Sequence, residues 1–149
     1  MNPEELLRAK KKAMSLLGYN DRTEWELMDK LFKAGFSEEA VNAATEYVKS
    51  FHYIDDERYA MRFADIYHNS RSINRIRQDL TKKHVPEEYI SLALESVDGG
   101  DSTALEKEVQ KILSGKELDC LEYKDKQKIA AKLYRKGFSV SDIRKRVGL

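Results

Sequence analysis

The sequence predicts an all-α fold of three tandem three-helix repeats that form an elongated, curved modular rod. Three observations lead to this prediction: apolar residues recur every three or four positions, proline and glycine are scarce, and one pattern occurs three times. With 2 prolines and 7 glycines in 149 residues, long helices are possible and a turn-rich β-sandwich is disfavoured. The predicted repeats are residues 1–54, 55–99 and 100–149.

The repetition is clearest in the second half of each repeat, where apolar positions match at fixed offsets. The second copy follows the first by 49 residues, and the third follows the second by 53. A unit of about 50 residues buries little core alone, so neighbouring repeats should lean on each other. The alternative is a single globular helical domain with accidental similarity. The matched positions are Leu27, Leu31, Phe36, Val41, Ala44 and Val48, then Ile76, Leu80, Val85, Ile90, Ala93 and Val97, then Ile129, Leu133, Phe138 and Ile143.

Each repeat is expected to open with one helix, over residues 3–17, 56–68 and 102–113. Two further helices follow, joined by a tight turn. Gly35, His84 and Gly137 mark these turns, and glycine suits the left-handed position after a helix.

Polar residues mark the expected helix starts. Ser37 and Ser139 are natural N-caps, and Asp55 or Asp56 can cap the helix at 56–68. Pro86 is tolerated in a first helical turn.

The net charge of +1 hides blocks of opposite sign. Residues 71–83 hold five Lys or Arg against one acid, and residues 124–149 hold nine against two. Residues 84–123 hold three against ten. The basic blocks could bind phosphate groups. The acidic blocks could bind a basic protein surface or keep loops exposed to water.

The outward face of the middle helix becomes more basic from repeat to repeat. The four matched outward residues have net charges of zero, +1 and +3. Such a stripe is typical of polyanion binding through phosphates, without base-specific contacts. The alternative is a solvated helix face. The matched residues are Glu26, Asp29, Lys30 and Lys33, then Arg75, Gln78, Asp79 and Lys82, then Lys128, Ala131, Lys132 and Arg135.

Several motifs are better explained by structure than by catalysis. Residues 114–117 lack the spacing and hydroxyl of a P-loop. The three histidines have no partners at metal-ligand spacing, so neither a metal site nor a cofactor is expected. Cys120 has no evident base, and a buried or half-exposed thiol is expected. Trp25 and Phe32 are predicted to pack in the core.

The cellular compartment is predicted to be the cytoplasm. A single cysteine fits a reducing compartment. No apolar run suffices for a membrane span, and residues 1–12 lack the apolar region of a secretory signal.

Three segments resemble the RecX family of regulatory proteins. Residues 53–60 with Phe63 resemble its signature stretch, and residues 75–83 resemble its next helix. Residues 133–139 with Ile143 resemble its closing helix pair. The chain departs from the family at residues 70–72 and at His84, where the family often has glycine.

The resemblance implies a bacterial, cytoplasmic protein without enzymatic activity. Its partners would be the RecA recombinase filament and DNA, either single-stranded or double-stranded, and the chain would be a monomer. RecX proteins typically inhibit RecA's ATP hydrolysis, strand exchange and the co-protease activity that triggers the SOS response.

Two other functions stay open: a sequence-tolerant DNA-binding helical protein that acts without RecA, and a protein-interaction scaffold that binds no nucleic acid. The residues expected to bind DNA or the filament share a positive charge on the basic segments. They are Arg71, Arg75, Arg77, Lys82, Lys83, Lys124, Lys128, Lys132, Arg135 and Lys136.

Overall fold

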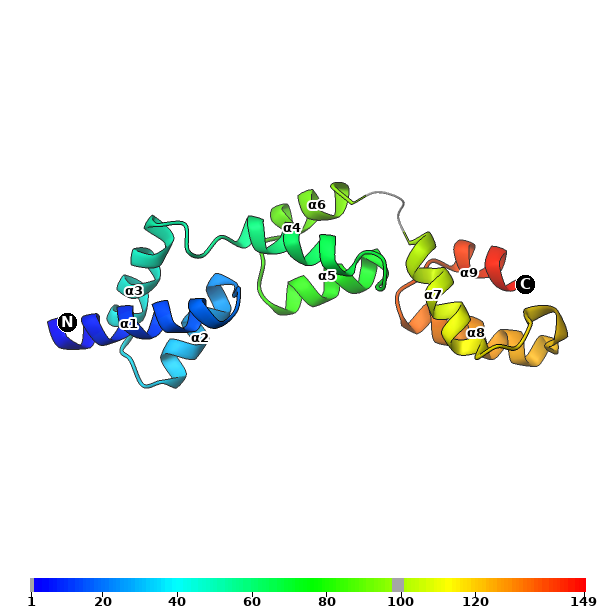
Figure 1. The fold of residues 1–149 in the computed structure, drawn as a ribbon, viewed down its shortest axis with the longest axis horizontal. Coiled ribbons are helices and arrows are strands. Elements are labelled where there is room, and N and C mark those ends of the chain that lie inside the picture. The colour runs from blue at the N-terminus through cyan, green and yellow to red at the C-terminus, as the bar shows by residue number, and fades with distance from the viewer. Residues whose placement is uncertain (1, 98–100) are drawn as a thin grey trace. The chain divides into compact units, whose positions relative to one another are not determined.

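The computed structural model describes residues 2–97 and 101–149, and within these residues the regular structure is entirely helical (Figure 1). This confirms the predicted all-α class and its three successive sets of three helices. The first set is α1 (Pro3–Tyr19), α2 (Glu24–Lys33) and α3 (Glu38–Ser50). The second is α4 (Asp56–Tyr67), α5 (Ile73–Lys82) and α6 (Glu87–Glu95). The third is α7 (Ser102–Leu113), α8 (Tyr123–Arg135) and α9 (Val140–Val147), with a short 3₁₀ helix at Leu118–Cys120 between α7 and α8.

The predicted turn after the middle helix is the same in all three repeats. Gly35, His84 and Gly137 have φ angles of 95°, 60° and 96°. In each turn the next residue donates its N–H to the carbonyl five residues back, over 3.2 to 3.3 Å. This geometry is a left-handed helix C-terminus, which satisfies carbonyls that the helix leaves open.

The helix starts largely follow the predicted caps. The Ser37 and Ser139 side chains accept N–H groups from the first turns of α3 and α9. Asp55 caps α4, because its Oδ1 accepts the Arg58 N–H at 3.0 Å. Pro86 lies one residue before α6 rather than within its first turn. Its fixed φ suits a helix start, and its carbonyl accepts the Ile90 N–H.

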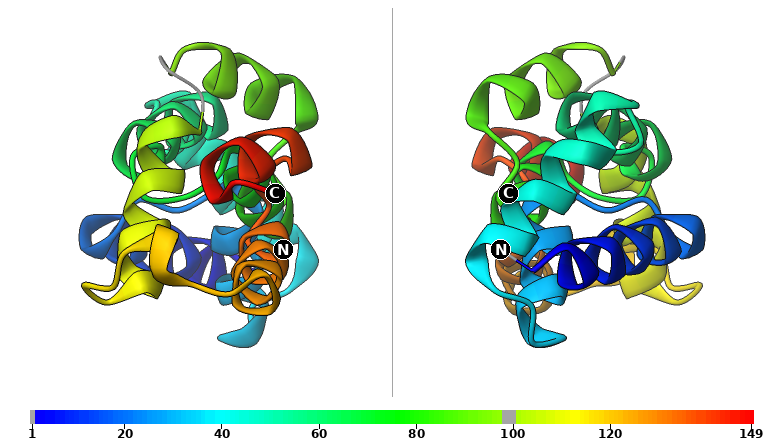
Figure 2. Two further views of the ribbon diagram at one scale, coloured as in Figure 1. Left: turned by 90° about the vertical axis from the view of Figure 1, so that its right-hand side faces the viewer. Right: turned by 90° about the vertical axis from the view of Figure 1, so that its left-hand side faces the viewer.

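The chain divides into two compact units, which are described separately. The first comprises Met1–Arg62 and Leu80–Leu92. Here α1, α2 and α3 pack on one another, with α1 beside α3 in the right-hand view of Figure 2. Their core is apolar and closed to solvent, and its larger members are Leu27, Leu31, Val41, Val48 and Ile54.

The second unit comprises Phe63–Asp79 and Ala93–Leu149. Here α8 packs against both α7 and α9, as the left-hand view of Figure 2 shows. The core between them contains Leu105, Val109, Leu133, Phe138 and Ile143. The predicted rod shape and repeat boundaries stay predictions.

Two expectations about side chains are wrong. Trp25 and Phe32 are 44% and 45% exposed, because the buried stripe of α2 runs through Leu27 and Leu31 on another side of the helix. Cys120 is exposed rather than buried or half-exposed, because the 3₁₀ segment that carries it buries none of its residues.

Candidate nucleic-acid interface

Of the three matched helix faces in the sequence, the outward face of α8 has the highest positive charge. In the structure this face is exposed to solvent. Lys124, Lys128, Lys132 and Arg135 are all exposed, while Ile129 and Leu133 point into the core. None of the four basic side chains forms an ion pair within residues 2–97 and 101–149. Their charges are therefore available to a polyanion.

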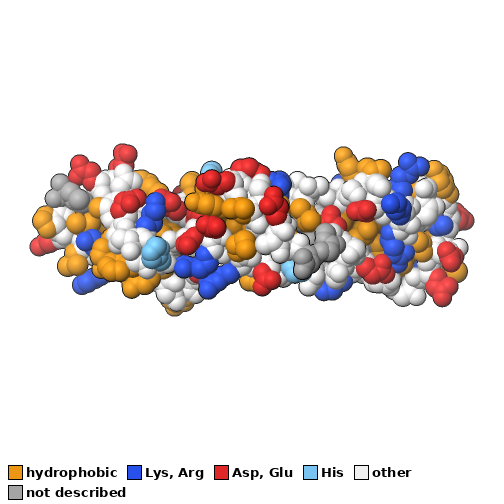
Figure 3. Space-filling model, turned by 90° about the horizontal axis from the view of Figure 1, so that it is seen from above, with side chains coloured by type: hydrophobic (Ala, Val, Ile, Leu, Met, Phe, Trp, Pro, Cys, Tyr) orange, Lys and Arg blue, Asp and Glu red, His pale blue; other side chains and the backbone are white. Residues whose placement is uncertain are grey.

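Figure 3 also shows basic side chains gathered on one face of the C-terminal part of the chain. Lys and Arg side chains form a row over the C-terminal part of the chain. Independently of this view, the last turn of α9 carries Arg144, Lys145 and Arg146. The prediction did not include these three residues, although their spacing as a basic run in the last helical turn was visible in the sequence.

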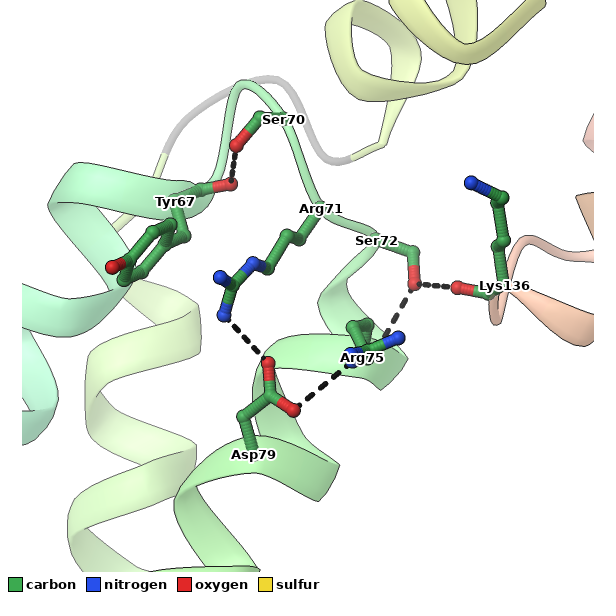
Figure 4. Close-up of polar contacts among 7 residues, drawn as sticks. All are labelled: Tyr67, Ser70, Arg71, Ser72, Arg75, Asp79 and Lys136. Atoms are coloured by element: carbon green, nitrogen blue, oxygen red, sulfur yellow. Dashed lines mark hydrogen bonds and ion pairs between the residues drawn. The ribbon is translucent and has the colours of Figure 1, made fainter. Parts of the chain in front are cut away.

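The matched face of α5 is less basic than its sequence suggests. Asp79 was placed on the outward face, but its side chain is only 12% exposed. It accepts hydrogen bonds from Arg71 at 2.8 Å and from Arg75 at 3.0 Å, one on each carboxylate oxygen (Figure 4). The Arg71 guanidinium also lies 3.8 Å from the centre of the Tyr67 ring. These contacts hold both arginines in fixed positions.

The two arginines line an open cavity of about 340 Å³. We call it the basic cavity; its charged lining residues are Arg71, Arg75, Glu108, Lys111 and Lys136. Lys136 Nζ lies 2.8 Å from Glu108 Oε2. Lys111, which the prediction missed, comes from α7, and its neighbours in the sequence gave no signal of a cavity.

The basic cavity adjoins a contact between two repeats, which we call the second joint. The Ser72 hydroxyl, buried at the start of α5, donates to the Lys136 carbonyl at the end of α8 over 2.8 Å (Figure 4). The next N–H, of Ile73, donates to Asp101 Oδ1 over 2.7 Å. Burial raises the pKa of this carboxyl group.

A corresponding contact in the other unit, the first joint, is made by the same kinds of groups: a hydroxyl to a helix-end carbonyl, and a backbone N–H to an Asp carboxylate. The buried Thr23 hydroxyl, at the start of α2, donates to the Lys83 carbonyl at the end of α5 over 2.9 Å. The Glu24 N–H donates to Asp56 Oδ1 over 2.9 Å, and burial raises the pKa of that carboxyl group too. In both joints the positive end of one helix meets the negative end of another, which is favourable.

Lys82 and Lys83 were predicted to bind DNA but lie in the unit without the basic cavity. Lys82 is exposed. Lys83 Nζ lies 3.4 Å from Glu26 Oε2. Burial works against the charge of this amine, but Tyr59 and Glu26 outweigh it and raise its pKa. The ion pair connects Lys83 to α2, and its role in DNA or filament binding stays a prediction. Arg77 is half-buried on α5.

Neither a metal cluster nor a membrane-spanning helix occurs among the described residues. Among residues 2–97 and 101–149, no three His, Cys, Asp or Glu side chains gather as a metal site would require. Over the same part of the chain, no helix has the length and apolar character to cross a bilayer.

Successive sets of three helices define the class of protein: a helical-repeat protein. Family models for the first and second three-helix domains of RecX match residues 9–47 and 55–94. The regulatory protein RecX of Caldanaerobacter subterraneus subsp. tengcongensis is 36% identical over 150 residues, which cover 100% of this chain and 74% of that protein. The chain belongs to the RecX family of regulatory proteins, which is not a family of enzymes.

Other RecX proteins are also similar to this chain in sequence or in structure. The regulatory protein RecX of Clostridium botulinum (strain Eklund 17B) is 31% identical over 90% of this chain, and the match spans 62% of that protein's length. The crystal structure of RecX from Lactobacillus salivarius has a TM-score of 0.80, 22% identity and 99% coverage of both chains, which shows the shared fold. A second crystal structure, of regulatory protein RecX, has a TM-score of 0.83 and 25% identity over 97% of this chain and 73% of that one.

Proposed function

We propose that this protein binds the RecA–single-stranded DNA filament in the bacterial cytoplasm and inhibits RecA. It acts as a monomer and lowers ATP hydrolysis, strand exchange and co-protease activity, and so restrains recombinational repair and the SOS response. Membership of the RecX family carries the proposal. A block of filament extension, or a clamp across neighbouring RecA protomers, would stop ATP turnover.

The exposed face of α8 supports the DNA part of the proposal. Its four basic side chains lie along one side of one helix and have no acidic partner in the described part of the chain. Phosphate contacts of this kind attach a protein to a nucleic acid without sequence preference. Arg71, Arg75 and Lys136 add a second basic site around the basic cavity.

RecA's DNA-dependent ATPase tests the proposal. Purified RecA is assembled on single-stranded DNA, and the full chain is added up to one molecule per RecA protomer. We expect ATP hydrolysis to fall, and to fall less as the salt concentration rises. An ATPase rate that stays constant up to stoichiometric protein would refute the proposal.

The exposed basic face also supports a second function, sequence-tolerant DNA binding that does not involve RecA. Gel shifts on single-stranded and duplex DNA, with and without RecA, separate the two. Tight binding to naked duplex that RecA does not enhance would favour the second function. A complex that forms preferentially on RecA-coated DNA favours the first.

A further inference from the structure

The two joints share their hydrogen bonds but differ in charge. Glu26 in the first joint corresponds to Arg75 in the second, 49 residues later, and Lys83 corresponds to Lys136, 53 residues later. Glu26 and Lys83 form an ion pair of 3.4 Å. At the second joint the acid is replaced by an arginine, so the matched side chains have the same charge, and both line the basic cavity.

The first joint is also closed by an aromatic pair that the second joint lacks. Trp25 stacks on His84 with ring centres 4.1 Å apart. The corresponding residues of the second joint are Asn74 and Gly137, and the Asn74 amide donates to the Gly137 carbonyl over 3.0 Å. The second joint therefore has neither the stack nor the ion pair, and the basic cavity lies beside it.

Positive charge exceeds negative charge around the basic cavity. Arg71, Arg75, Lys111 and Lys136 provide four cations, and Glu108 on the lining and Asp79 beside it provide two anions. The Lys111 ammonium group has no ion-pair partner among the described residues. Like charges held around one space repel, and an anion between them removes the repulsion.

The two arginines retain donors for such an anion. Asp79 accepts from one nitrogen of each guanidinium, Nη1 of Arg71 and Nε of Arg75. A guanidinium group has five N–H donors, so several on each side chain are left for a ligand. Because Asp79 holds both guanidinium groups, and the Tyr67 ring also contacts that of Arg71, less conformational entropy is lost when they bind.

A second cavity in the same unit provides a comparison. It has a volume of about 570 Å³, and its charged lining residues are Lys116, Glu117, Asp119, Lys126 and Arg146. Two acids offset three bases there, and Arg146 is already bound to Glu106 at 2.6 Å. The smaller basic cavity is the better anion site.

We propose that the basic cavity binds one phosphate group, which bridges Arg71 and Arg75 of the second repeat to Lys111 and Lys136 of the third. The phosphate supplies the negative charge that Glu26 supplies in the first joint, where it pairs with Lys83. By pairing with the cations around the basic cavity, it strengthens the second joint. If the phosphate belongs to a DNA backbone, this inference rests on the proposed function. A free phosphate ion would be recognised by the same side chains.

The test follows the amide signals of the ¹⁵N-labelled full chain during two titrations. One uses inorganic phosphate, and the other uses an oligothymidylate without terminal phosphates. We expect signals of Ser72 and Gly137, at the second joint, to shift with at least one probe, while those of Thr23 and His84 stay in place. Shifts with the oligothymidylate alone identify the backbone as the source, and shifts with phosphate alone identify the free ion.

Variants make the assignment specific. The double variant Arg75→Gln with Lys111→Gln should bind the active probe about tenfold more weakly, since it loses two charge-assisted contacts. Lys30→Gln removes one exposed charge of α2, in the unit without the basic cavity, and should change the affinity less than about twofold. Equal affinity for the double variant and Lys30→Gln, or no shift at the second joint with either probe, would overturn the inference.

RecA's ATPase, measured with the same proteins, distinguishes this inference from the proposed function. A wild-type chain that inhibits RecA without any shift at the second joint disproves the phosphate site and leaves the proposed function standing. A chain that binds phosphate through Arg75 and Lys111 but leaves RecA's ATPase unchanged disproves the proposed function and leaves the phosphate site standing.

Discussion

Thr23 and Lys83 are 60 residues apart, yet the Thr23 hydroxyl donates a 2.9 Å hydrogen bond to the Lys83 carbonyl. The same hydroxyl accepts the Glu26 N–H at 3.2 Å, so one buried group both caps α2 and binds the end of α5. Ser72 does the same for α5 and α8. The hydroxyl that caps a helix thus also makes the hydrogen bond to the next repeat.

Thr23→Val should destabilise the protein by about 1–3 kcal/mol, because the valine neither caps α2 nor donates to Lys83. The free energy of unfolding is measured with urea and circular dichroism. Thr23→Ser keeps the hydroxyl and should lose less than about 1 kcal/mol. A smaller loss for Val, which keeps a methyl group, than for Ser, which keeps the hydroxyl, would show that the methyl group matters more than the hydroxyl.

Gly137→Ala should cost more stability than Gly35→Ala. Both glycines have nearly the same φ, 96° and 95°, so both variants carry a similar backbone strain of about 1–2 kcal/mol. A Cβ at Gly137 would lie 2.6 Å from Ser72 Oγ, whereas the space at Gly35 is open. The extra loss for Gly137, about 1 kcal/mol, arises because the Cβ must displace Ser72 Oγ, which donates to the Lys136 carbonyl, and crowds Asn74 Cβ, 3.2 Å away. Identical unfolding curves for the two variants would contradict this reading of the second joint.

Leu80→Ala should lower the free energy of unfolding by about 2–5 kcal/mol, because Leu80 is fully buried and its removal leaves a cavity. Ile66→Ala is the control: that side chain is 68% exposed, and its truncation should cost less than about 0.5 kcal/mol. Thermal and urea unfolding followed by circular dichroism measure both. A loss below about 1 kcal/mol for Leu80 would mean that this position is not part of a packed core.

What the sequence predicted correctly is local in the chain. The turns at Gly35 and Gly137 and the caps at Ser37 and Ser139 depend on residues within about five positions. Burial of Leu27 and Leu31 follows from helical periodicity, which repeats in each copy. Such features need no knowledge of distant segments, so they are readable from one sequence.

What the sequence missed depends on distant partners. Trp25 is exposed on its own helix and stacks on His84 across the first joint. Asp79 is covered because Arg71 reaches it from the loop before α5. Lys111 reaches the basic cavity from α7. Periodicity within one helix carries no signal for contacts of this kind.

Acid should weaken the contact between α7 and α9 within a defined pH range. Hydrogen bonds from Arg146 and Gln110 lower the pKa of Glu106 from 4.5 to about 2. The ionised carboxylate therefore stabilises the fold above pH 4.5, and this contribution disappears as the pH falls towards 2.

Glu106→Gln should therefore lower the free energy of unfolding at pH 7. Because the ion pair is partly exposed, we expect a loss of less than about 1 kcal/mol. Urea unfolding at pH 7 and at pH 3 should show the difference between variant and wild type shrinking in acid. Glu117→Gln, an exposed acid of the same repeat, is the control. A difference for Glu106 that stays constant over this range would rule out the ion pair as its source.

Reversing the charges of α8 tests the basic face. Replacing Lys128, Lys132 and Arg135 by Glu should weaken binding to single-stranded DNA, and to RecA on DNA, by at least about tenfold at low salt. The slope of affinity against salt should become shallower, because fewer counterions are released. The matched pair for α2 is Lys30 and Lys33, where Lys33 is already bound to Asp29 at 2.9 Å.

A double Glu variant at Lys30 and Lys33 should therefore change binding less than a double variant at Lys128 and Lys132. Fluorescence anisotropy with a labelled oligothymidylate gives both affinities, and circular dichroism confirms that each variant is folded. The four side chains are exposed on their helices, so these substitutions leave the cores intact. Similar losses from the two pairs would mean that net charge alone governs binding, and the basic face of α8 would then have no special role.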